Sequence, residues 1–332
     1  MAIGAEGKVP EWCGYRSPPV PPPADGGSPR SAPKTDPDLV SPSDTTRADV
    51  LYTADLHGSR ELYVESFALA RRLGVRAVIL GGDLAPHATV VEQRSFYQGF
   101  LIPLLREYRS EKDSAEIFYI MGNDDWSANL PVLQRAGIER FHHIHCTVRP
   151  FLDKTWIAGL GSVTLTPFAL KDWERWEEGL GGPIRQEGFR SQADGSVHPF
   201  DFRGREWEEW IGRDLETIGK ELTPERQPLV CAFHGPPHGT ALDLIHGDAH
   251  VGSREVRKFL EKQRPLLSLH GHIHESPAVS GKFADRLGPT ICVNPGQRMG
   301  STLHAVWFRF DDLAGSLTHT LLGPATLDPP GT

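Results

Sequence analysis

The sequence predicts an α/β layered fold, and three observations support this prediction. Apolar stretches with strand character alternate with stretches of helical spacing, and several predicted strands end in glycine or a polar residue. A hydrophobic content of 39% in 332 residues is enough for a sizeable core. Since ligands of such folds bind at the carboxyl ends of strands, we expect one large domain with its functional residues at those ends.

The alternation starts at residue 49 and continues along the chain. DVLYTAD (49–55) reads as a short strand, SRELYVESFALARRLG (59–74) as a helix and RAVILGGD (76–83) as a second strand. A polar, Trp-rich insertion is expected at about 166–205, after TWIAGLGS, and no internal repeat is visible. The remaining predicted elements are helices at 90–108, after Trp126, at 206–222 and at 253–263, and strands at 116–121, 228–234, 265–270, 290–294 and 303–310.

The first 47 residues differ from the rest. They contain SPPVPPPADGGSPRSAP, which has no periodic apolar residues and cannot offset its ordering entropy by burial. We predict a disordered Pro/Gly/Ser-rich tail at 1–47, with a proline-rich ligand as the alternative, and a catalytic domain at 48–325.

Composition restricts the classes of function. The four cysteines are isolated and form no C-x-x-C, which argues against a disulfide framework or a thiolate metal site and favours a reducing cytoplasm. Nothing near Met1 combines a basic start with an apolar stretch, and no run reaches the roughly 18 apolar residues of a membrane helix. A formal charge of -8 argues against long nucleic acid as a partner. Nothing in the sequence specifies an oligomeric state.

Four short motifs lie where predicted strands end. They contain Asp55 and His57 in TADLHG, Asp83 in LGGDLA, Asn123 in MGND, and His272 with His274 in HGHIHE, and a lone His234 ends a further predicted strand. Each motif alone is weak, since a D-x-H triplet is expected about once by chance in such a chain. Asp248 and His250 form a second D-x-H, but in a polar connection. Order and strand-end placement together make the first set specific.

With these motifs the sequence resembles the calcineurin-like metallophosphoesterase superfamily, whose ordered signature is D-x-H, G-D, G-N-H, H and G-H-x-H. The resemblance covers roughly residues 48 to 310, and FHGPPHGTALD, HVGS and VNPG resemble a small prokaryotic phosphodiesterase-like branch. It implies a four-layer αββα sandwich with two mixed β-sheets and two metal ions. Carried over by position, one ion is held by Asp55, His57 and His274, the other by Asn123, His234 and His272, and Asp83 bridges them.

These residue types suit the hydrolysis of a phosphate ester by two metal ions. Two divalent ions about 3.5 to 4 Å apart act on a shared water and on the phosphoryl oxygens, so a metal-bridging hydroxide becomes the nucleophile. Mixed imidazole and carboxylate ligands suit Mn, Fe or Zn. In H-x-H on a strand, side chains i and i+2 share one face, so we expect His272 and His274 to reach adjacent metals from a strand.

Asp124 departs from the family pattern. Members usually carry histidine after Gly-Asn, where it is proposed to protonate the leaving oxygen. An aspartate beside metals stays ionised and is a poor proton donor. We therefore expect Asp124 to orient water or to bind metal with Asp125. The proton donor is then another residue such as His238, or the enzyme prefers leaving groups that depart as stable anions. GDLAPHA also lacks the arginine of G-D-x-x-D-R-G, which argues against a phosphoprotein phosphatase.

Other residues have two interpretations each. His238 and His250, with Asn123, are candidates for substrate binding, and His87 and His270 are candidates for supporting contacts. FHHIHC, with His143 and His145, is interpreted as an ordinary strand, and Asn294 to Gly296 as a turn. We interpret Trp173, Trp176, Trp207 and Trp210 as the core of the insertion rather than as a stacking surface for a base.

We therefore predict a cytoplasmic binuclear metallophosphoesterase that acts as a phosphodiesterase on a small phosphorylated substrate, such as a nucleotide or another phosphodiester. A phosphomonoesterase or nucleotide pyrophosphatase is the alternative within enzymes, with a metal-dependent nuclease less favoured by the acidic balance. A non-catalytic metal-binding interaction module is the alternative from another class, disfavoured because all seven expected metal ligands are present.

Overall fold

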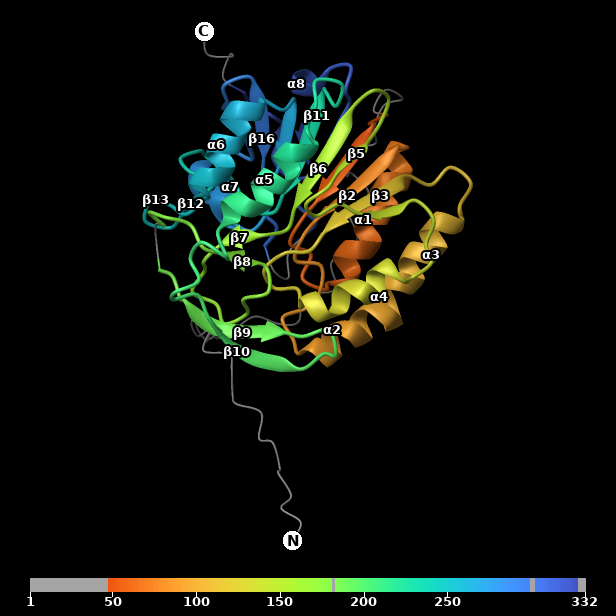
Figure 1. Ribbon diagram of the computed structural model, residues 1–332. Coiled ribbons are helices and arrows are strands. Elements are labelled where there is room, and N and C mark those ends of the chain that lie inside the picture. The colour runs from red at the N-terminus through yellow and green to blue at the C-terminus, as the bar shows by residue number, and fades with distance from the viewer. Residues whose placement is uncertain (1–46, 181–182, 299–301, 328–332) are drawn as a thin grey trace, which may run out of the picture. The chain divides into compact units, whose positions relative to one another are not determined.

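The computed structural model describes residues 47–180, 183–298 and 302–327, and Figure 1 shows the arrangement of their helices and strands. The tail predicted at 1–47 lies outside the described residues except for Arg47. The architecture below is that of the compact unit that begins at Thr45.

The first sheet has seven strands in the order β19-β18-β17-β1-β2-β3-β4. β1 to β4 run parallel, and β17 pairs antiparallel with β1. β1 and β2 are buried throughout, which explains their continuous apolar sequences. The strands are β1 Val50–Thr53, β2 Ala77–Gly81, β3 Glu116–Ile120, β4 Phe141–His143, β17 Ala305–Phe308, β18 Thr318–His319 and β19 Gly323–Pro324.

The second sheet has six strands in the order β15-β16-β14-β11-β6-β5. Its four central strands run parallel, and its two edge strands are antiparallel to their neighbours. The strands are β5 Val148–Pro150, β6 Trp156–Leu160, β11 Leu229–Phe233, β14 Leu267–Leu269, β15 Ala284–Leu287 and β16 Thr290–Val293. Both sheets are therefore mixed.

Helices cover the outer face of each sheet. In Figure 1, α1, α3 and α4 lie over the sheet that contains β2 and β3, and α5 and α6 lie over the sheet that contains β6 and β16. The helices are α1 Arg60–Leu73, α2 Val90–Phe96, α3 Ile102–Ser110, α4 Leu130–Gln134, α5 Ile211–Glu221, α6 Arg254–Gln263, α7 Ser276–Ser280 and α8 Leu313–Ser316, with a π-helical turn Tyr97–Leu101 and a 3-10 turn Ser127–Asn129. The π turn joins α2 to α3, so the helix predicted at 90–108 is continuous.

Three apolar clusters fill the spaces between these layers. One lies between the first sheet and its helices, and one lies between the second sheet and α5 and α6. The third lies between the two sheets, where Tyr52 and Ile79 meet Val230 and Leu269. The predicted four-layer αββα sandwich with two mixed sheets is confirmed.

Local interactions of α1 show how the sequence sets an element that supports a strand-end loop. The Ser59 hydroxyl accepts a hydrogen bond from the Leu62 amide, and Gly74 ends the helix at φ 59°, a left-handed conformation that suits glycine. The buried Tyr63 donates from its hydroxyl to the Leu84 carbonyl oxygen at 2.9 Å. Packing of α1 therefore fixes the loop that follows Asp83.

The helix predicted at 206–222 starts later than expected. Trp210 has φ -72° and ψ 129°, and α5 begins only at Ile211. The Trp176 amide donates to the Glu209 carbonyl and the Ile211 amide donates to the Trp176 carbonyl, at 2.7 and 3.0 Å. These two bonds hold Trp210 extended, so tertiary pairing delays the start of the helix.

The predicted insertion at about 166–205 contains short strands. They are β8 Glu174–Arg175, which pairs with β7 Val163–Thr164, and a hairpin of β9 Glu187–Ser191 and β10 Val197–Asp201. The Asp172 carboxylate accepts hydrogen bonds from the Ser127 amide at 2.8 Å and the Ser191 hydroxyl at 2.5 Å. This carboxylate ties the insertion to the segment that follows Asn123. Among the described residues, no helix combines the length and apolar character needed to cross a bilayer.

Candidate metal centre

The expected ligands lie at the carboxyl ends of parallel strands from both sheets. Asp55 and His57 follow β1, Asp83 follows β2 and Asn123 follows β3, whereas His234 follows β11. His272 and His274 follow β14 in a loop, because β14 already ends at Leu269. The prediction that these two histidines share one face of a strand is therefore wrong. The loop brings them to the site because the Gly271 amide donates to the His234 carbonyl oxygen at 2.9 Å.

Four of these residues have a left-handed backbone, which is costly for residues other than glycine. The φ values are 58° for Asp55, 42° for His57, 50° for Asp83 and 67° for His272. Surrounding bonds hold them: the His57 amide donates to the Asp83 carbonyl at 2.9 Å, and the His272 amide donates to the Asp55 carboxylate at 3.0 Å. Strain of this kind gathers at functional sites.

One group of ligand atoms comes from Asp55, His57, Asp83 and His274, all within 4.8 Å of one another. His57 Nε2 lies 3.2 Å from His274 Nε2 and 3.8 Å from Asp83 Oδ2. His274 Nε2 lies 3.5 Å from Asp55 Oδ1. Two ring nitrogens that face each other at 3.2 Å leave room for one proton at most, so at least one lone pair points into the group.

A second group comes from Asp83, His234 and His272, again within 4.8 Å. His234 Nε2 lies 3.3 Å from Asp83 Oδ2 and 3.3 Å from Asn123 Oδ1, and its Nδ1 donates to the Gly81 carbonyl oxygen at 2.8 Å. That bond leaves Nε2 for the group, as a ligating imidazole requires. Asp83 belongs to both groups, so its carboxylate stands where a bridging ligand would.

Charges in the two groups shift one another's pKa values. Burial raises the pKa of the Asp83 carboxyl, but the imidazoles of His234 and His57 outweigh burial and bring it well below its usual range. Burial lowers the pKa of His234, but Asp83 outweighs it and raises the pKa to about 10, whereas burial lowers that of His272 to about 3. Converging carboxylate and imidazole donors are those that Mn, Fe and Zn prefer, so the residues fit two divalent ions.

Asp124 and Asp125 have different surroundings. Burial and the charge of Asp83 raise the pKa of Asp125 to about 7. The Asp125 carboxylate accepts hydrogen bonds from the amides of Leu84, Ala85 and Gly122 and from the Tyr97 hydroxyl, at 2.8 to 3.0 Å. It therefore joins the loops after β2 and β3 rather than facing either group. The expectation that Asp125 binds metal with Asp124 is wrong.

Asp124 faces the outside of the first group. Its amide donates to Asp83 Oδ1 at 2.8 Å, and its carboxylate lies 3.0 Å from His87 Nδ1. The hydrogen bond to Asp124 raises the pKa of His87. Pairing of Asp124 with His87 was not visible in the sequence, where His87 was only a general candidate for a supporting contact.

His238 and His250 meet at a different carboxylate. His250 Nδ1 lies 2.8 Å and His238 Nδ1 3.6 Å from the buried Asp243, and neither histidine belongs to the two ligand groups. The Asp243 carboxylate also accepts bonds from the amides of Gly239 and Gly252. Asp243 therefore organises the loop after β11, and the roles of His238 as proton donor and of His250 in substrate binding stay predictions.

Two buried polar side chains hold the histidine loops. His270 Nδ1 donates to the carbonyl oxygens of Phe233 and Gly235, which flank His234, at 2.9 and 3.1 Å. Asn294 Nδ2 donates to the Gly271 and Ile273 carbonyls on either side of His272, at 3.3 and 3.1 Å. Asn294 thus fixes the second histidine loop in addition to the turn that was predicted for it.

A further cluster, His145 with Cys146 and Asp214, is bonded internally. His145 accepts from the Gly161 amide through Nδ1 and lies 3.3 Å from Cys146 Sγ through Nε2. The neighbouring Asp214 carboxylate accepts hydrogen bonds from Ser162 and Arg175. β4 carries His143, in line with the interpretation of this segment as a strand.

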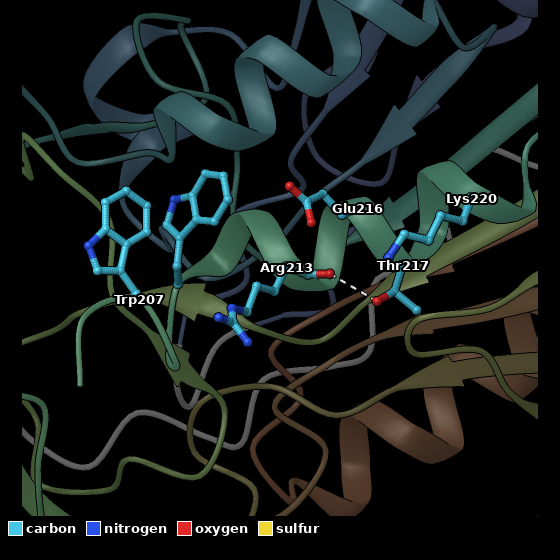
Figure 2. A pocket seen from close by; sticks show the side chains of 6 residues that line it. Trp207, Arg213, Glu216, Thr217 and Lys220 are labelled. Atoms are coloured by element: carbon cyan, nitrogen blue, oxygen red, sulfur yellow. Dashed lines mark hydrogen bonds between the residues drawn. The ribbon is translucent and has the colours of Figure 1, made fainter.

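The tryptophans separate into different environments. Trp173 is buried in the cluster under the first sheet, in line with a core role. Trp207 is 70% exposed, so its assignment to a core is wrong. A hollow of about 430 Å³ lies beside it over α5 and includes no member of either ligand group. Figure 2 shows the side chains that line this hollow. Its lining residues are Trp207, Trp210, Arg213, Glu216, Thr217 and Lys220.

The carboxylates and imidazoles gathered at the strand ends of this four-layer αββα sandwich are the donors expected in a metal-dependent phosphoric ester hydrolase. The model of the calcineurin-like phosphoesterase family matches residues 48–276, and the chain belongs to this family. The resemblance noted in the motifs is thereby confirmed. Comparison with curated proteins gives no significant match.

Solved structures show the same fold. The protein TT1561 of Thermus thermophilus is 19% identical with a TM-score of 0.50, over 79% of this chain and 94% of that chain. A dimetal phosphatase from Danio rerio is 12% identical with a TM-score of 0.50, over 80% of this chain and 94% of that chain. At these identities the likeness is one of fold.

Proposed function

We propose that the protein is a binuclear metal-dependent phosphodiesterase that acts on a small substrate such as a nucleotide or another phosphodiester. The shared position of Asp83 carries this proposal, because it places one carboxylate between two groups of ligand atoms. In the proposed assignment, Asp55, His57 and His274 would hold one ion, Asn123, His234 and His272 would hold the other, and Asp83 would serve both. Mn, Fe and Zn suit these donors. When bound, two such ions supply a nucleophile from water at neutral pH and neutralise charge on the phosphoryl oxygens.

The chain's own residues orient and shield this centre. Asp83, Asn123 and His234 are at most 2% exposed, so these residues are shielded from solvent. The more exposed side chains around the centre are those of His274, Asp124 and His87, at 26%, 13% and 44%, and of the partly exposed His272, and they define its open side. The substrate therefore approaches past Asp124 and His87.

The charge of this open side favours a diester. A phosphomonoester carries a charge of about -1.5 to -2 at neutral pH, whereas a diester carries about -1. Asp124 places a carboxylate at the opening, and the chain lacks the G-D-x-x-D-R-G arginine that would neutralise a second charge. The chain also lacks the histidine that usually follows Gly-Asn as proton donor, so leaving groups that depart as stable anions are preferred.

We also propose a cytoplasmic location, supported by the cysteines. Cys146, Cys231 and Cys292 are free thiols, and thiols persist in a reducing compartment. Burial raises the pKa of the Cys146 thiol to about 12 and that of the Cys292 thiol well above its usual range, so neither is a reactive thiolate.

Hydrolysis of bis-p-nitrophenyl phosphate and of p-nitrophenyl phosphate tests the proposal, with metal-stripped protein reloaded with Mn, Zn or Mg. We expect metal-dependent turnover with kcat/KM at least about tenfold higher for the diester, the effect of about 1.4 kcal/mol of repulsion. Asp83→Asn should abolish turnover of both compounds. Asp124→Asn should lower the ratio of kcat/KM for the diester to kcat/KM for the monoester. Equal or higher kcat/KM for the monoester would contradict a diesterase. No turnover with any metal, despite two bound ions, would favour the interaction module.

A further inference from the structure

The Asp124 carboxylate lies between two imidazoles. Its Oδ2 is 3.0 Å from His87 Nδ1 and 3.6 Å from His57 Nδ1. The two rings stack, with 4.5 Å between centroids and 16° between planes. We propose that Asp124 is a positioning residue, which fixes the orientation of the metal ligand His57 and holds His87 over the outer face of that ligand. This inference rests on the proposed assignment of His57 to the metal centre.

The two nitrogens of His57 have different surroundings. Nε2 faces the first ligand group, 3.2 Å from His274 Nε2. Nδ1 is buried and makes no hydrogen bond to any described residue. An imidazole that ligates through Nε2 carries its proton on Nδ1 and needs an acceptor there, which in metal sites is often a carboxylate. Asp124 Oδ2 is the carboxylate oxygen that faces Nδ1, and a shift of about 0.7 Å would bring it to hydrogen-bond distance.

The backbone of Asp124 is fixed on both sides. Its amide donates to Asp83 Oδ1 at 2.8 Å, and its carbonyl oxygen accepts from Gln93 Nε2 at 2.6 Å. Because Asp83 belongs to both ligand groups, the first bond ties the position of Asp124 directly to the centre. The carboxylate of Asp124 therefore projects from a fixed point.

Gln93, a fully buried residue of α2, fixes His87 to the same frame. Besides the Asp124 carbonyl, Gln93 Nε2 donates to the Pro86 carbonyl at 3.0 Å, and Gln93 Oε1 accepts from the Trp126 amide at 2.9 Å. One side chain thus joins the loop before His87 to the loop of Asp124. These bonds fix the backbone on both sides of the contact between His87 and Asp124.

Exposure shows what this arrangement does for His57. The side chain of His57 is 4% exposed, whereas that of the stacked His87 is 44% exposed. His87 therefore covers the ligand from solvent, and Asp124 holds both rings. Where the family usually carries one histidine after Gly-Asn, this chain uses a carboxylate bonded to an imidazole from another loop.

Titration of metal-stripped, full-length protein with Mn²⁺ or Zn²⁺ in a calorimeter tests the inference without any activity assay. In Asp124→Ala we expect the affinity for one of the two ions to fall about 10- to 100-fold, the usual effect of removing such a carboxylate, while the other ion binds as before. Asp124→Asn keeps an acceptor oxygen and should recover part of the loss. Asp248→Asn removes an exposed carboxylate at φ 59°, where asparagine is tolerated, and should change neither affinity.

The outcomes separate this inference from the proposed function. If wild-type protein binds two ions and Asp124→Ala binds both with unchanged affinity, Asp124 does not position His57 and the metal centre stands. If wild-type protein binds fewer than two ions, the proposed binuclear function fails and the inference fails with it. Thermal unfolding of the stripped proteins shows whether each variant is folded. If Asp124→Ala is not folded, the ion affinities of Asp124→Asn are compared with those of Asp248→Asn, and equal affinities would contradict the inference.

Discussion

Substitution of Gly122 by alanine should dismantle the metal centre through a single methyl group. A Cβ at this position would lie 2.2 Å from Asp83 Oδ1 and 2.7 Å from His234 Nε2, whereas real Cβ contacts essentially never fall below 3.0 Å. Both neighbours are expected metal ligands, and the Asp83 amide at 2.5 Å prevents the new methyl group from escaping toward that backbone. The ligands must therefore move.

The required movement is large compared with what a metal site tolerates. The Asp83 oxygen has to shift by the difference between 3.0 and 2.2 Å, which is 0.8 Å. Ligand distances in a metal site hold to about 0.2 Å, so we expect loss of both ions from Gly122→Ala. Overpacking should also lower the free energy of unfolding of the stripped protein by about 1 to 3 kcal/mol.

Urea unfolding with and without Mn²⁺ measures both effects. In wild-type protein, free Mn²⁺ at about 100 times the dissociation constant should add about 2.7 kcal/mol per site, and Gly122→Ala should show no such gain. Gly99→Ala is the matched control, since Gly99 is exposed and a Cβ there meets nothing within 4 Å. Retention of the full Mn²⁺ stabilisation by Gly122→Ala would refute the steric reasoning.

Three further predictions concern the surroundings of the site and the stability of the fold. Lys171→Met leaves the fully buried Glu174 without its ion-pair partner at 2.6 Å, so urea unfolding should show a loss of about 3 to 5 kcal/mol, partly recovered by adding Glu174→Leu; no recovery would contradict this reading. Burial lowers the pKa of His319 to about 4 from 6.5, so between these pH values only the unfolded chain binds this proton. Stability should therefore fall by about 2 kcal/mol from pH 7 to pH 5 through this group, and an unchanged pH dependence in His319→Gln would argue against it. Asp125→Asn replaces one acceptor oxygen by an amide group that donates, although four donors surround this side chain, so the free energy of unfolding should fall by about 2 to 4 kcal/mol. A loss of less than about 1 kcal/mol would show that Asp125 does not join the two loops.

The ligands that could be predicted from sequence are those that come after an apolar strand-like run. Asp55, Asp83 and Asn123 lie two or three residues after the ends of buried parallel strands of one sheet, and such strand ends meet at one edge. Local patterning and chain order were sufficient there, because each ligand is fixed by the strand before it.

Residues whose role depends on partners from other loops could not be predicted. Asp124 and Asp125 are identical in sequence terms, yet one faces His87 and the other accepts three backbone amides from two loops. Gln93 looked like an ordinary helical residue, because its partners lie up to 33 residues away. The strand assignment of His272 failed for a similar reason, since the Gly271 amide turns toward the His234 carbonyl oxygen of another strand end.

Anomalous diffraction from crystals grown with Mn²⁺ would test the shared two-ion centre most directly. We expect two peaks about 3.5 to 4 Å apart on either side of the Asp83 carboxylate, one near His57 and His274 and the other near His234 and His272, and loss of both peaks in Asp83→Asn. A single peak, or two peaks that do not share Asp83, would contradict a binuclear centre.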